Sequence, residues 1–263
     1  MGRPLSVYFT RMRLAPLFAL TIALLVPASS ALSQDAPGIN PSFGPPKNVL
    51  ELFTSQGCDT CPPADTVLAS FAGQPDIIAI TLPVDIWDYL GWKDTLATDK
   101  NSERQKAYAK ARGDGAIYTP QVVVNGSEHA NGANRRAIDA SAETTSHLTV
   151  AVSAQRSGND IVVSVGAAAS GGATNATIVL LPYLASRAVA IGRGENARAK
   201  VTYTNIVRDI VPVAEWSGSA ITRTVPLDRY RDFDGVAVLL QAGSPENPGA
   251  ILGAARVALG SKT

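Results

Sequence analysis

The sequence predicts an α/β domain with the element order βαβαββα, followed by an antiparallel β-sandwich-like region. Three observations favour this fold class. Between residues 48 and 145, nearly continuous apolar runs, which are typical of buried strands, alternate with helix-like segments. An Asn-Gly dipeptide at residues 125 and 126 indicates a tight antiparallel hairpin inside that region. From residue 146 onward, short stretches of alternating hydrophobicity are separated by turn residues, as in antiparallel sheets.

The first strand, helix and second strand surround a pair of cysteines. Residues 49–53 are mostly apolar and predict a buried strand. The following helix is expected to begin near Pro62, because proline is tolerated at the first helical position but not in the interior, and to end near Gly73. Residues 76–82 predict a second strand, which should run parallel to the first because a helical crossover connects the two.

The remaining elements complete the α/β region. An aromatic-rich connection at residues 83–97 leads to a polar helix expected at residues 98–112. Residues 121–124 predict a third strand, and the Asn-Gly turn after it calls for a return strand at residues 127–130. A closing helix is expected at residues 134–145.

The C-terminal region differs in its hydrophobic pattern. We therefore expect one domain at residues 48–145 and a second, β-rich domain at residues 146–263. The strand candidates of the second domain are residues 148–153, 161–165, 177–182, 189–192, 200–204, 220–225, 235–241 and 252–259.

The N-terminal segment has the order of a secretory signal peptide. Three arginines within the first 13 residues precede an uncharged apolar run at residues 14–27 and then a stretch of small residues. We expect a signal peptide at residues 1–33 and a proline-rich tether at residues 34–47. The apolar run is shorter than the ~20 residues that a spanning helix needs. The sequence thus predicts a periplasmic or secreted protein without a membrane span after cleavage.

The composition excludes several functional classes. The formal net charge is +1, so no charge surplus indicates binding to nucleic acid or to an anionic membrane surface. The chain has two histidines, His129 and His147, which we expect to be structural, and two cysteines. These residues are too few for a multi-ligand metal site, and we expect no cofactor.

Cys58 and Cys61 have the Cys-x-x-Cys spacing and are the only cysteines of the chain. A disulfide at this spacing is a weak staple: closing so short a loop stabilises the fold by about 2 kcal/mol, against about 4.7 kcal/mol for a hundred-residue loop. The spacing instead favours a bond that opens and closes with little backbone movement. A redox-active pair is the leading interpretation, and a structural disulfide and a metal-ligand pair remain open.

Local charge and geometry bear on the reduction potential of this pair. A helix N-terminus stabilises a thiolate through its partial positive charge and free N–H groups. Asp59 opposes a low thiol pKa, and the two prolines after Cys61 shift the helix start away from Cys58. We therefore expect Cys58 to be the nucleophile, Cys61 to resolve the mixed disulfide, and the reduction potential to be moderate to low.

The residues around the cysteines resemble the thioredoxin superfamily over residues 48–145. The match consists of the strand, Cys58-Asp-Thr-Cys61 and the helix, together with Thr119-Pro120 leading into Val-Val-Val-Asn-Gly. The resemblance implies a cis peptide bond at Pro120, beside the disulfide. More narrowly, Glu-Leu-Phe-Thr-Ser-Gln-Gly-Cys-x-x-Cys-Pro-Pro-Ala-Asp with Trp-Asp-Tyr-Leu-Gly-Trp-Lys-Asp is similar to a family of uncharacterised secreted bacterial proteins. Those proteins pair a thioredoxin-like domain with a C-terminal β-rich region, to whose pattern Gly194-Glu-Asn and Val207-Arg208 are similar.

Other side chains are candidates for a place beside the thiols. The carboxyl ends of parallel strands share one edge of a sheet, so Trp87, Tyr89 and Trp92 are expected to line an apolar substrate groove near Cys58. The alternative is that they pack their own loop onto the domain. Asp65 and Glu51 are candidates for proton transfer at Cys61, although either can also have a purely structural role.

Two functions follow from these observations. The first is an exported thiol–disulfide oxidoreductase that reduces or isomerises the disulfides of a protein or small-thiol substrate. The second is a non-catalytic binding module in which Cys58 and Cys61 form a structural disulfide or a Cu(I) site.

Overall fold

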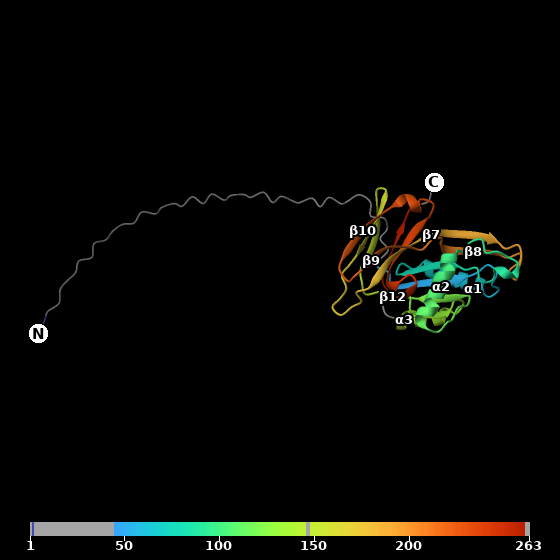
Figure 1. Ribbon diagram of the computed structural model, residues 1–263, viewed down its shortest axis with the longest axis horizontal. Helices are drawn as coiled ribbons and strands as arrows, with labels where there is room; N and C mark the ends of the chain where they lie inside the picture. The colour runs from blue at the N-terminus through green and yellow to red at the C-terminus, as the bar shows by residue number, and fades with distance from the viewer. Residues whose placement is uncertain (1, 3–44, 146–147, 261–263) are drawn as a thin grey trace. The chain divides into compact units, whose positions relative to one another are not determined.

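The computed structural model describes Gly2, residues 45–145 and residues 148–260 (Figure 1). The predicted signal peptide, Gly2 aside, lies outside the described residues, as do residues 34–44 of the predicted tether and His147. Among the described residues, no helix is long and apolar enough to cross a bilayer.

Residues 45–145 form three helices and four strands, with one short 3₁₀ helix. In chain order these are β1 (Asn48–Thr54), α1 (Cys61–Ala72), β2 (Ile77–Pro83), η1 (Asp88–Leu90), α2 (Asp99–Arg112), β3 (Gln121–Val124), β4 (Glu128–Asn131) and α3 (Arg135–Thr144).

Local sequence explains the bounds of these elements. The two prolines occupy the first positions of α1, where their missing N–H groups cost least. The Thr98 side chain accepts a hydrogen bond from the Asn101 N–H and so caps α2. Asn125 and Gly126 have φ values of 49° and 74°, the left-handed backbone that a tight hairpin between β3 and β4 requires.

Residues 148–260 form strands and one further 3₁₀ helix. In chain order these are β5 (Val152–Ser157), β6 (Asp160–Val165), β7 (Ala176–Ala190), β8 (Lys200–Val207), β9 (Val211–Trp216), β10 (Ile221–Pro226), η2 (Leu227–Tyr230), β11 (Gly235–Ser244) and β12 (Asn247–Ala258).

Strands from both halves form one mixed sheet. Its nine strands run in the order β12-β11-β7-β8-β2-β1-β3-β4, with β9 paired to β7, and β10-β6-β5 form a separate three-stranded sheet. The two halves join where Thr81 of β2 pairs in parallel with Ile206 of β8. The predicted fold class, a compact βαβαββα domain followed by a separate sandwich, is therefore wrong.

The length of β7 explains why the predicted division into a compact domain and a separate sandwich is wrong. The sequence pattern predicts two short strands at residues 177–182 and 189–192, whereas β7 is one 15-residue strand that contains the first of these segments and ends at Ala190, inside the second. Its buried first part pairs with β11 and β9, and its second part pairs with β8. Alternating hydrophobicity predicts which residues are extended but not which strand pairs with which. The connection of β8 to β2 was therefore not predictable from that pattern.

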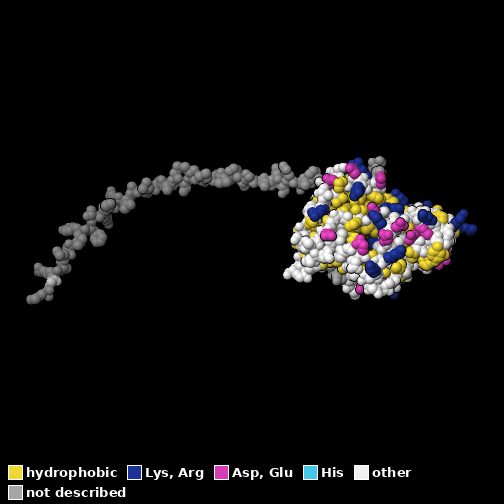
Figure 2. All heavy atoms as spheres, viewed as in Figure 1, with side chains coloured by type: hydrophobic (Ala, Val, Ile, Leu, Met, Phe, Trp, Pro, Cys, Tyr) yellow, Lys and Arg dark blue, Asp and Glu magenta, His cyan; other side chains and the backbone are white. Residues whose placement is uncertain are grey.

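Three main clusters of apolar side chains hold these layers together. On one face of the sheet, Leu50 and Leu52 of β1 pack with Leu68 and Phe71 of α1. On the other face, Phe53 packs with Tyr108 of α2 and with β7, β11 and β12. The three-stranded sheet covers a further core against β7, β11 and β12. On the face drawn in Figure 2, basic and acidic side chains are interspersed.

Candidate functional site

Cys58 and Cys61 form a disulfide at the junction of β1 and α1, so the predicted bond is confirmed. The two Cα atoms lie 5.4 Å apart. The Cys58 side chain is 4% exposed and that of Cys61 is fully buried. The Cys61 N–H donates to the Cys58 carbonyl oxygen at 3.2 Å, which closes the turn that carries both sulfurs. The disulfide is thus held in a tight, covered turn.

The segment at Thr119–Pro120 lies against this part of the molecule. The peptide bond between these residues is cis, as the resemblance implies. Gly132 leaves room between Pro120 and α1, because a Cβ atom at this glycine would lie 3.1 Å from the Ala64 Cβ and 3.2 Å from the Pro120 Cβ. Pro120 is therefore close to the first turn of α1.

Trp87 connects the cysteine turn to the proline segment. Its indole Nε1 donates to the Thr119 hydroxyl at 2.8 Å. A Cβ atom on Gly57 would lie 2.9 Å from the Trp87 Cβ, so only glycine lets the backbone before Cys58 approach this tryptophan. Tyr89 is 75% exposed, and its ring centroid lies 6.1 Å from that of Trp87. Trp87 thus lies against the backbone just before Cys58, and the Tyr89 ring lies close to that of Trp87.

Trp92 points to a different neighbour. Its Nε1 donates to Gln56 Oε1 at 2.8 Å, and its ring packs on Gly192 in the connection between β7 and β8. It also contacts the small apolar cluster that contains Leu96 and Ile191. The structure thus places Trp92 as a packing residue next to the cysteine turn, and does not bring its ring together with those of Trp87 and Tyr89.

Asn196 is a contact of the cysteine turn that the sequence analysis did not single out for a role. It lies in the β7–β8 connection, and its Nδ2 donates to the carbonyl oxygens of Cys58 at 2.7 Å and Gln56 at 3.0 Å. The C-terminal half therefore holds the backbone of the cysteine turn directly. The sequence feature that could have indicated this contact is the Gly194-Glu-Asn motif. It belongs to the family pattern described above, but that pattern gives it no role.

Asp65 lies one helical turn after Cys61 on the buried side of α1. Its side chain is 4% exposed, and neither carboxyl oxygen has a hydrogen-bond partner among the described residues. Burial raises the pKa of Asp65 well above its ordinary value. The Thr54 hydroxyl, a nearby donor that has no partner within 3.5 Å, lowers this pKa by a smaller amount, and Asp94 raises it further. The folded protein therefore favours the protonated form of this carboxyl.

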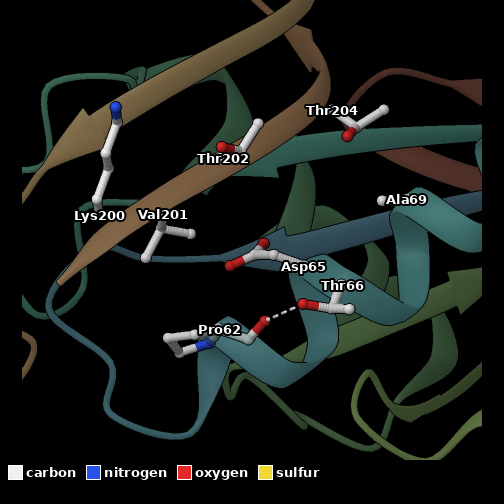
Figure 3. A pocket seen from close by; sticks show the side chains of 8 residues that line it. All are labelled: Pro62, Asp65, Thr66, Ala69, Lys200, Val201, Thr202 and Thr204. Carbon is white, nitrogen blue, oxygen red and sulfur yellow. Dashed lines mark hydrogen bonds between the residues drawn. The ribbon is translucent and has the colours of Figure 1, made fainter.

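A crevice separates Asp65 from β8. It has a volume of about 320 Å³. Figure 3 shows the Asp65 carboxyl between α1 and β8, below Val201 and Thr202. The residues that line it are Pro62, Asp65, Thr66, Ala69, Lys200, Val201, Thr202 and Thr204.

Asp94 is a second buried carboxylate that the sequence analysis assigned no role. It accepts hydrogen bonds from the N–H groups of Gln56 at 2.7 Å, Leu96 at 2.8 Å and Ala97 at 3.0 Å. Burial raises its pKa, which these bonds partly offset. Asp94 thus fixes the start of the cysteine turn, and its signal was the final Asp of the Trp-Asp-Tyr-Leu-Gly-Trp-Lys-Asp motif.

Glu51 lies away from the cysteines, on the other face of the sheet. Its carboxylate accepts two hydrogen bonds from Arg104, at 2.7 and 3.1 Å, and one from the Tyr108 hydroxyl. Gln241 of β11 donates to the same hydroxyl at 2.8 Å. Glu51 is therefore part of a buried network that joins β1, α2 and β11, and the structure does not bring it to Cys61.

His129 also lies away from the disulfide, in a surface cluster. Its Nδ1 lies 2.8 Å from the Tyr118 hydroxyl, and its Nε2 lies 3.2 Å from an oxygen of Asp114. Within residues 45–145 and 148–260, no group of three or more His, Cys, Asp or Glu side chains could hold a metal ion.

The fold and the site define a mixed α/β protein with a covered disulfide at a strand-to-helix junction, held by contacts from both halves of the chain. The chain belongs to the family described as "Protein of unknown function (DUF1223)", whose model matches residues 49–241. The sequence-based expectation of an uncharacterised family is thus confirmed at the level of the family.

Two solved structures are similar to this chain. One is the crystal structure of protein AGR_C_4864 from Agrobacterium tumefaciens, with 35% identity, a TM-score of 0.73, and coverage of 83% of this chain and 97% of that one. The other is HBP35 of Porphyromonas gingivalis, with 12% identity, a TM-score of 0.52, and coverage of 82% of this chain and 76% of that one. The second likeness concerns the fold alone. No curated protein matches the chain.

Proposed function

We propose that this protein is an exported thiol–disulfide oxidoreductase that uses Cys58 and Cys61 to reduce or isomerise disulfides in periplasmic or secreted substrates. The observation that carries the proposal is the disulfide itself: it joins the only two cysteines, closes a turn at the start of α1, and lies beside Trp87 and the Thr119–Pro120 segment. The resemblance to thioredoxins supports this proposal through the residues of the site alone. It does not extend to the whole fold.

The chemistry needs both cysteines. In the reducing direction, the Cys58 thiolate attacks one sulfur of a substrate disulfide, so a mixed disulfide forms and the other substrate sulfur leaves as a thiolate. The Cys61 thiolate then attacks the Cys58 sulfur, which releases the second substrate thiolate and restores the Cys58–Cys61 disulfide. Two electrons pass to the substrate, and an external thiol or dithiol must reduce the pair before the next turnover.

Asp65 is the proposed proton acceptor for the Cys61 thiol. Residues four positions apart on a helix lie on the same face, with Cβ atoms about 5–6 Å apart. A carboxyl whose pKa is raised by burial exchanges protons nearer to neutral pH than an exposed one. Glu51 is not part of this proposal, because Arg104 and Tyr108 occupy its oxygens.

Trp87 and Tyr89 are the proposed contacts for a peptide substrate. Tyr89, with Leu90 at 39% and Ile117 at 43% exposure, is one of the exposed large apolar side chains of the described residues. Ile117 is two residues before Thr119, whose hydroxyl accepts a hydrogen bond from Trp87, so Ile117 is close in sequence to the segment that Trp87 contacts. A substrate that binds there must displace part of the cover over Cys58.

Export is part of the proposal because disulfides persist in oxidising compartments. The supporting observation is the order of a basic start, an apolar run and small residues over residues 1–33.

The test is the reduction potential of the cysteine pair in the purified protein, measured by equilibration with glutathione or dithiothreitol buffers followed by alkylation. We expect a reversible value between roughly −120 and −270 mV, in the lower part of that range. A potential below about −300 mV, or a bond that does not exchange, contradicts the proposal.

A second experiment tests the substrate contacts. Tyr89→Ala should lower the rate of exchange with peptide disulfides, because a surface contact is lost, and should leave reduction by dithiothreitol unchanged. Equal rates for the variant and the parent with peptide disulfides would remove Tyr89 from the proposal.

The burial of both sulfurs favours one alternative, a non-catalytic binding module. In that case the disulfide is structural, or the reduced pair binds Cu(I). A disulfide that resists strong reductants while the protein stays folded supports the structural form. Tight Cu(I) uptake by the reduced chain, measured in competition with a chromogenic Cu(I) chelator, supports the metal form.

A further inference from the structure

Thr60 is an exposed residue between the two cysteines, and its side chain contacts the disulfide. The Thr60 Oγ1 lies 3.5 Å from the Cys58 Sγ. A disulfide sulfur carries no proton, so the hydroxyl is the donor of this hydrogen bond and the sulfur is the acceptor. Within residues 45–145 and 148–260, this is the one hydrogen bond that reaches either sulfur.

The start of α1 explains why this hydroxyl is available. Thr60 is the residue before the helix, where a side-chain oxygen ordinarily accepts from the N–H of the second or third helical residue. Those two positions hold Pro62 and Pro63, which have no N–H. The Thr60 side chain accordingly makes no capping hydrogen bond, and its backbone has φ −88° and ψ −1° instead of the extended conformation of most caps. The hydroxyl is therefore left for the sulfur.

The same prolines remove donors that a thiolate at a helix N-terminus otherwise receives. Of the first three helical residues only Cys61 has an N–H, and it donates to the Cys58 carbonyl oxygen at 3.2 Å. That oxygen also accepts from the Asn196 Nδ2 at 2.7 Å, and the Cys58 N–H donates to the Ser55 carbonyl oxygen at 3.2 Å. The backbone of Cys58 is thus held by three contacts, and its sulfur depends on Thr60 for a donor.

Charged side chains on the segments around the turn do not replace these donors. Acidic groups near Cys58 oppose the negative charge of a thiolate. Among the described residues, no basic side chain donates a hydrogen bond to a sulfur. On the turn, the start of α1, residues 87–94 and residues 192–198, the acidic side chains are Asp59, Asp65, Asp88, Asp94 and Glu195, and the basic ones are Lys93, Arg193 and Arg198.

We propose that the Thr60 hydroxyl donates a hydrogen bond to the Cys58 thiolate of the reduced protein and thereby makes Cys58 the nucleophile of the pair. This inference rests on the proposed thiol–disulfide exchange, in which a thiolate is the attacking group. A hydrogen bond to a charged acceptor is stronger than one to a neutral acceptor, so the contact strengthens when Cys58 ionises. The hydroxyl keeps its hydrogen throughout, and the proton of the Cys58 thiol passes to solvent.

The test follows the ionisation of each cysteine by NMR in the reduced full chain, labelled with ¹³C at the cysteine Cβ atoms. The two Cβ signals are assigned with Cys61→Ser. In the parent, Cys58 should ionise at a lower pH than Cys61. Thr60→Val has the same shape without the hydroxyl, so it should raise the midpoint of the Cys58 titration by about one pH unit.

Two further variants make the test specific to this hydroxyl. Thr60→Ser retains the hydroxyl and should keep the midpoint of the parent. Thr66→Val removes another exposed hydroxyl from α1, one that donates to the Pro62 carbonyl oxygen at 3.2 Å, and should also keep it. Equal midpoints for the parent and Thr60→Val, or equal shifts in Thr60→Val and Thr60→Ser, overturn the proposal. The dispersion of the amide spectrum reports whether each variant is folded.

Exchange of the parent with glutathione separates this inference from the proposed function. A parent that exchanges reversibly, together with a Thr60→Val variant that titrates like the parent, overturns the role of Thr60 alone. A parent that does not exchange contradicts the proposed function, and the role of Thr60 in that reaction fails with it. Reversible exchange together with a raised midpoint in Thr60→Val alone supports both.

Discussion

Glu51 and Asp65 are both buried carboxylates within 15 residues of each other, but their surroundings are opposite. Glu51 is fully buried and paired: Arg104 donates two hydrogen bonds to it and Tyr108 a third. Asp65, on the other side of the sheet, is 4% exposed and has no hydrogen-bond partner among the described residues.

The difference teaches how to separate a structural charge from a candidate functional one. A buried carboxylate whose hydrogen-bonding capacity is used by the protein joins elements together, as Glu51 joins β1 to α2. A buried carboxylate without partners destabilises the fold, and it persists where another role compensates for this cost. Burial alone does not distinguish the two cases, whereas the partners do.

The largest effect is expected for Arg104→Met, which leaves Glu51 buried without its counter-ion. The free energy of unfolding should fall by about 3–5 kcal/mol, measured by urea denaturation. Lys100→Met, on the same helix, removes an exposed pair with Asp209 and serves as the control, with a loss of no more than ~1 kcal/mol. Similar losses for the two variants would refute the distinction between the buried and the exposed pair.

Asp65→Asn should change the free energy of unfolding in the opposite direction, so that the variant is more stable than the parent. Because burial raises the pKa of Asp65, the folded state holds this proton more tightly than the unfolded state, and the unfolding free energy falls as pH rises above the ordinary Asp pKa. The variant lacks this loss, so it should be more stable than the parent by about 1–3 kcal/mol at pH 8 and equally stable near pH 4. Unfolding curves across this pH range measure the difference. A parent and variant with the same pH dependence would contradict the prediction.

Asn196→Ala tests the contact that covers the cysteine turn. Loss of two hydrogen bonds to the carbonyl oxygens of Gln56 and Cys58 should loosen the turn and speed reduction of the disulfide by a phosphine about tenfold, equivalent to ~1.4 kcal/mol. Glu195→Ala, an exposed neighbour on the same connection, is the control. An unchanged rate, or the same acceleration in the control, would show that Asn196 does not restrict access.

The smallest effect is expected for Lys47→Met. Lys47 lies 3.1 Å from Asp76, but the two side chains are 71% and 39% exposed. The pair lowers the pKa of Asp76, yet water screens it, so the variant should lose less than ~1 kcal/mol in urea denaturation. A loss comparable to that of Arg104→Met would mean that burial does not set the strength of these pairs.

Local features of this molecule were predictable from the sequence. The strand, cysteine turn and helix at the start follow from an apolar run and from two prolines that fit only a helix start. The hairpin follows from Asn125 and Gly126. Placement of Trp87 near Cys58 follows from the shared edge of parallel strands.

Non-local features were not predictable. The single pairing of Thr81 with Ile206, which merges the two halves, has no local signature. The contact of Asn196 with Cys58 spans 138 residues and depends on that pairing. The different surroundings of Glu51 and Asp65 depend on Arg104 and β8, which come close to these carboxylates only in the folded chain. For these reasons the sequence predicts the cysteine turn but not what covers it.

The merged sheet determines how the two halves of the chain should behave when they are made as separate polypeptides. Because β2 and β8 are neighbours and Phe53 shares a core with β7, β11 and β12, each half presents apolar surface that the other half covers. Two polypeptides that end at residue 145 and begin at residue 148 should therefore be insoluble when made separately and should reassemble when made together. If the two fragments reassemble, they can be used as a split reporter, with the cysteine turn on one fragment and Asn196 on the other.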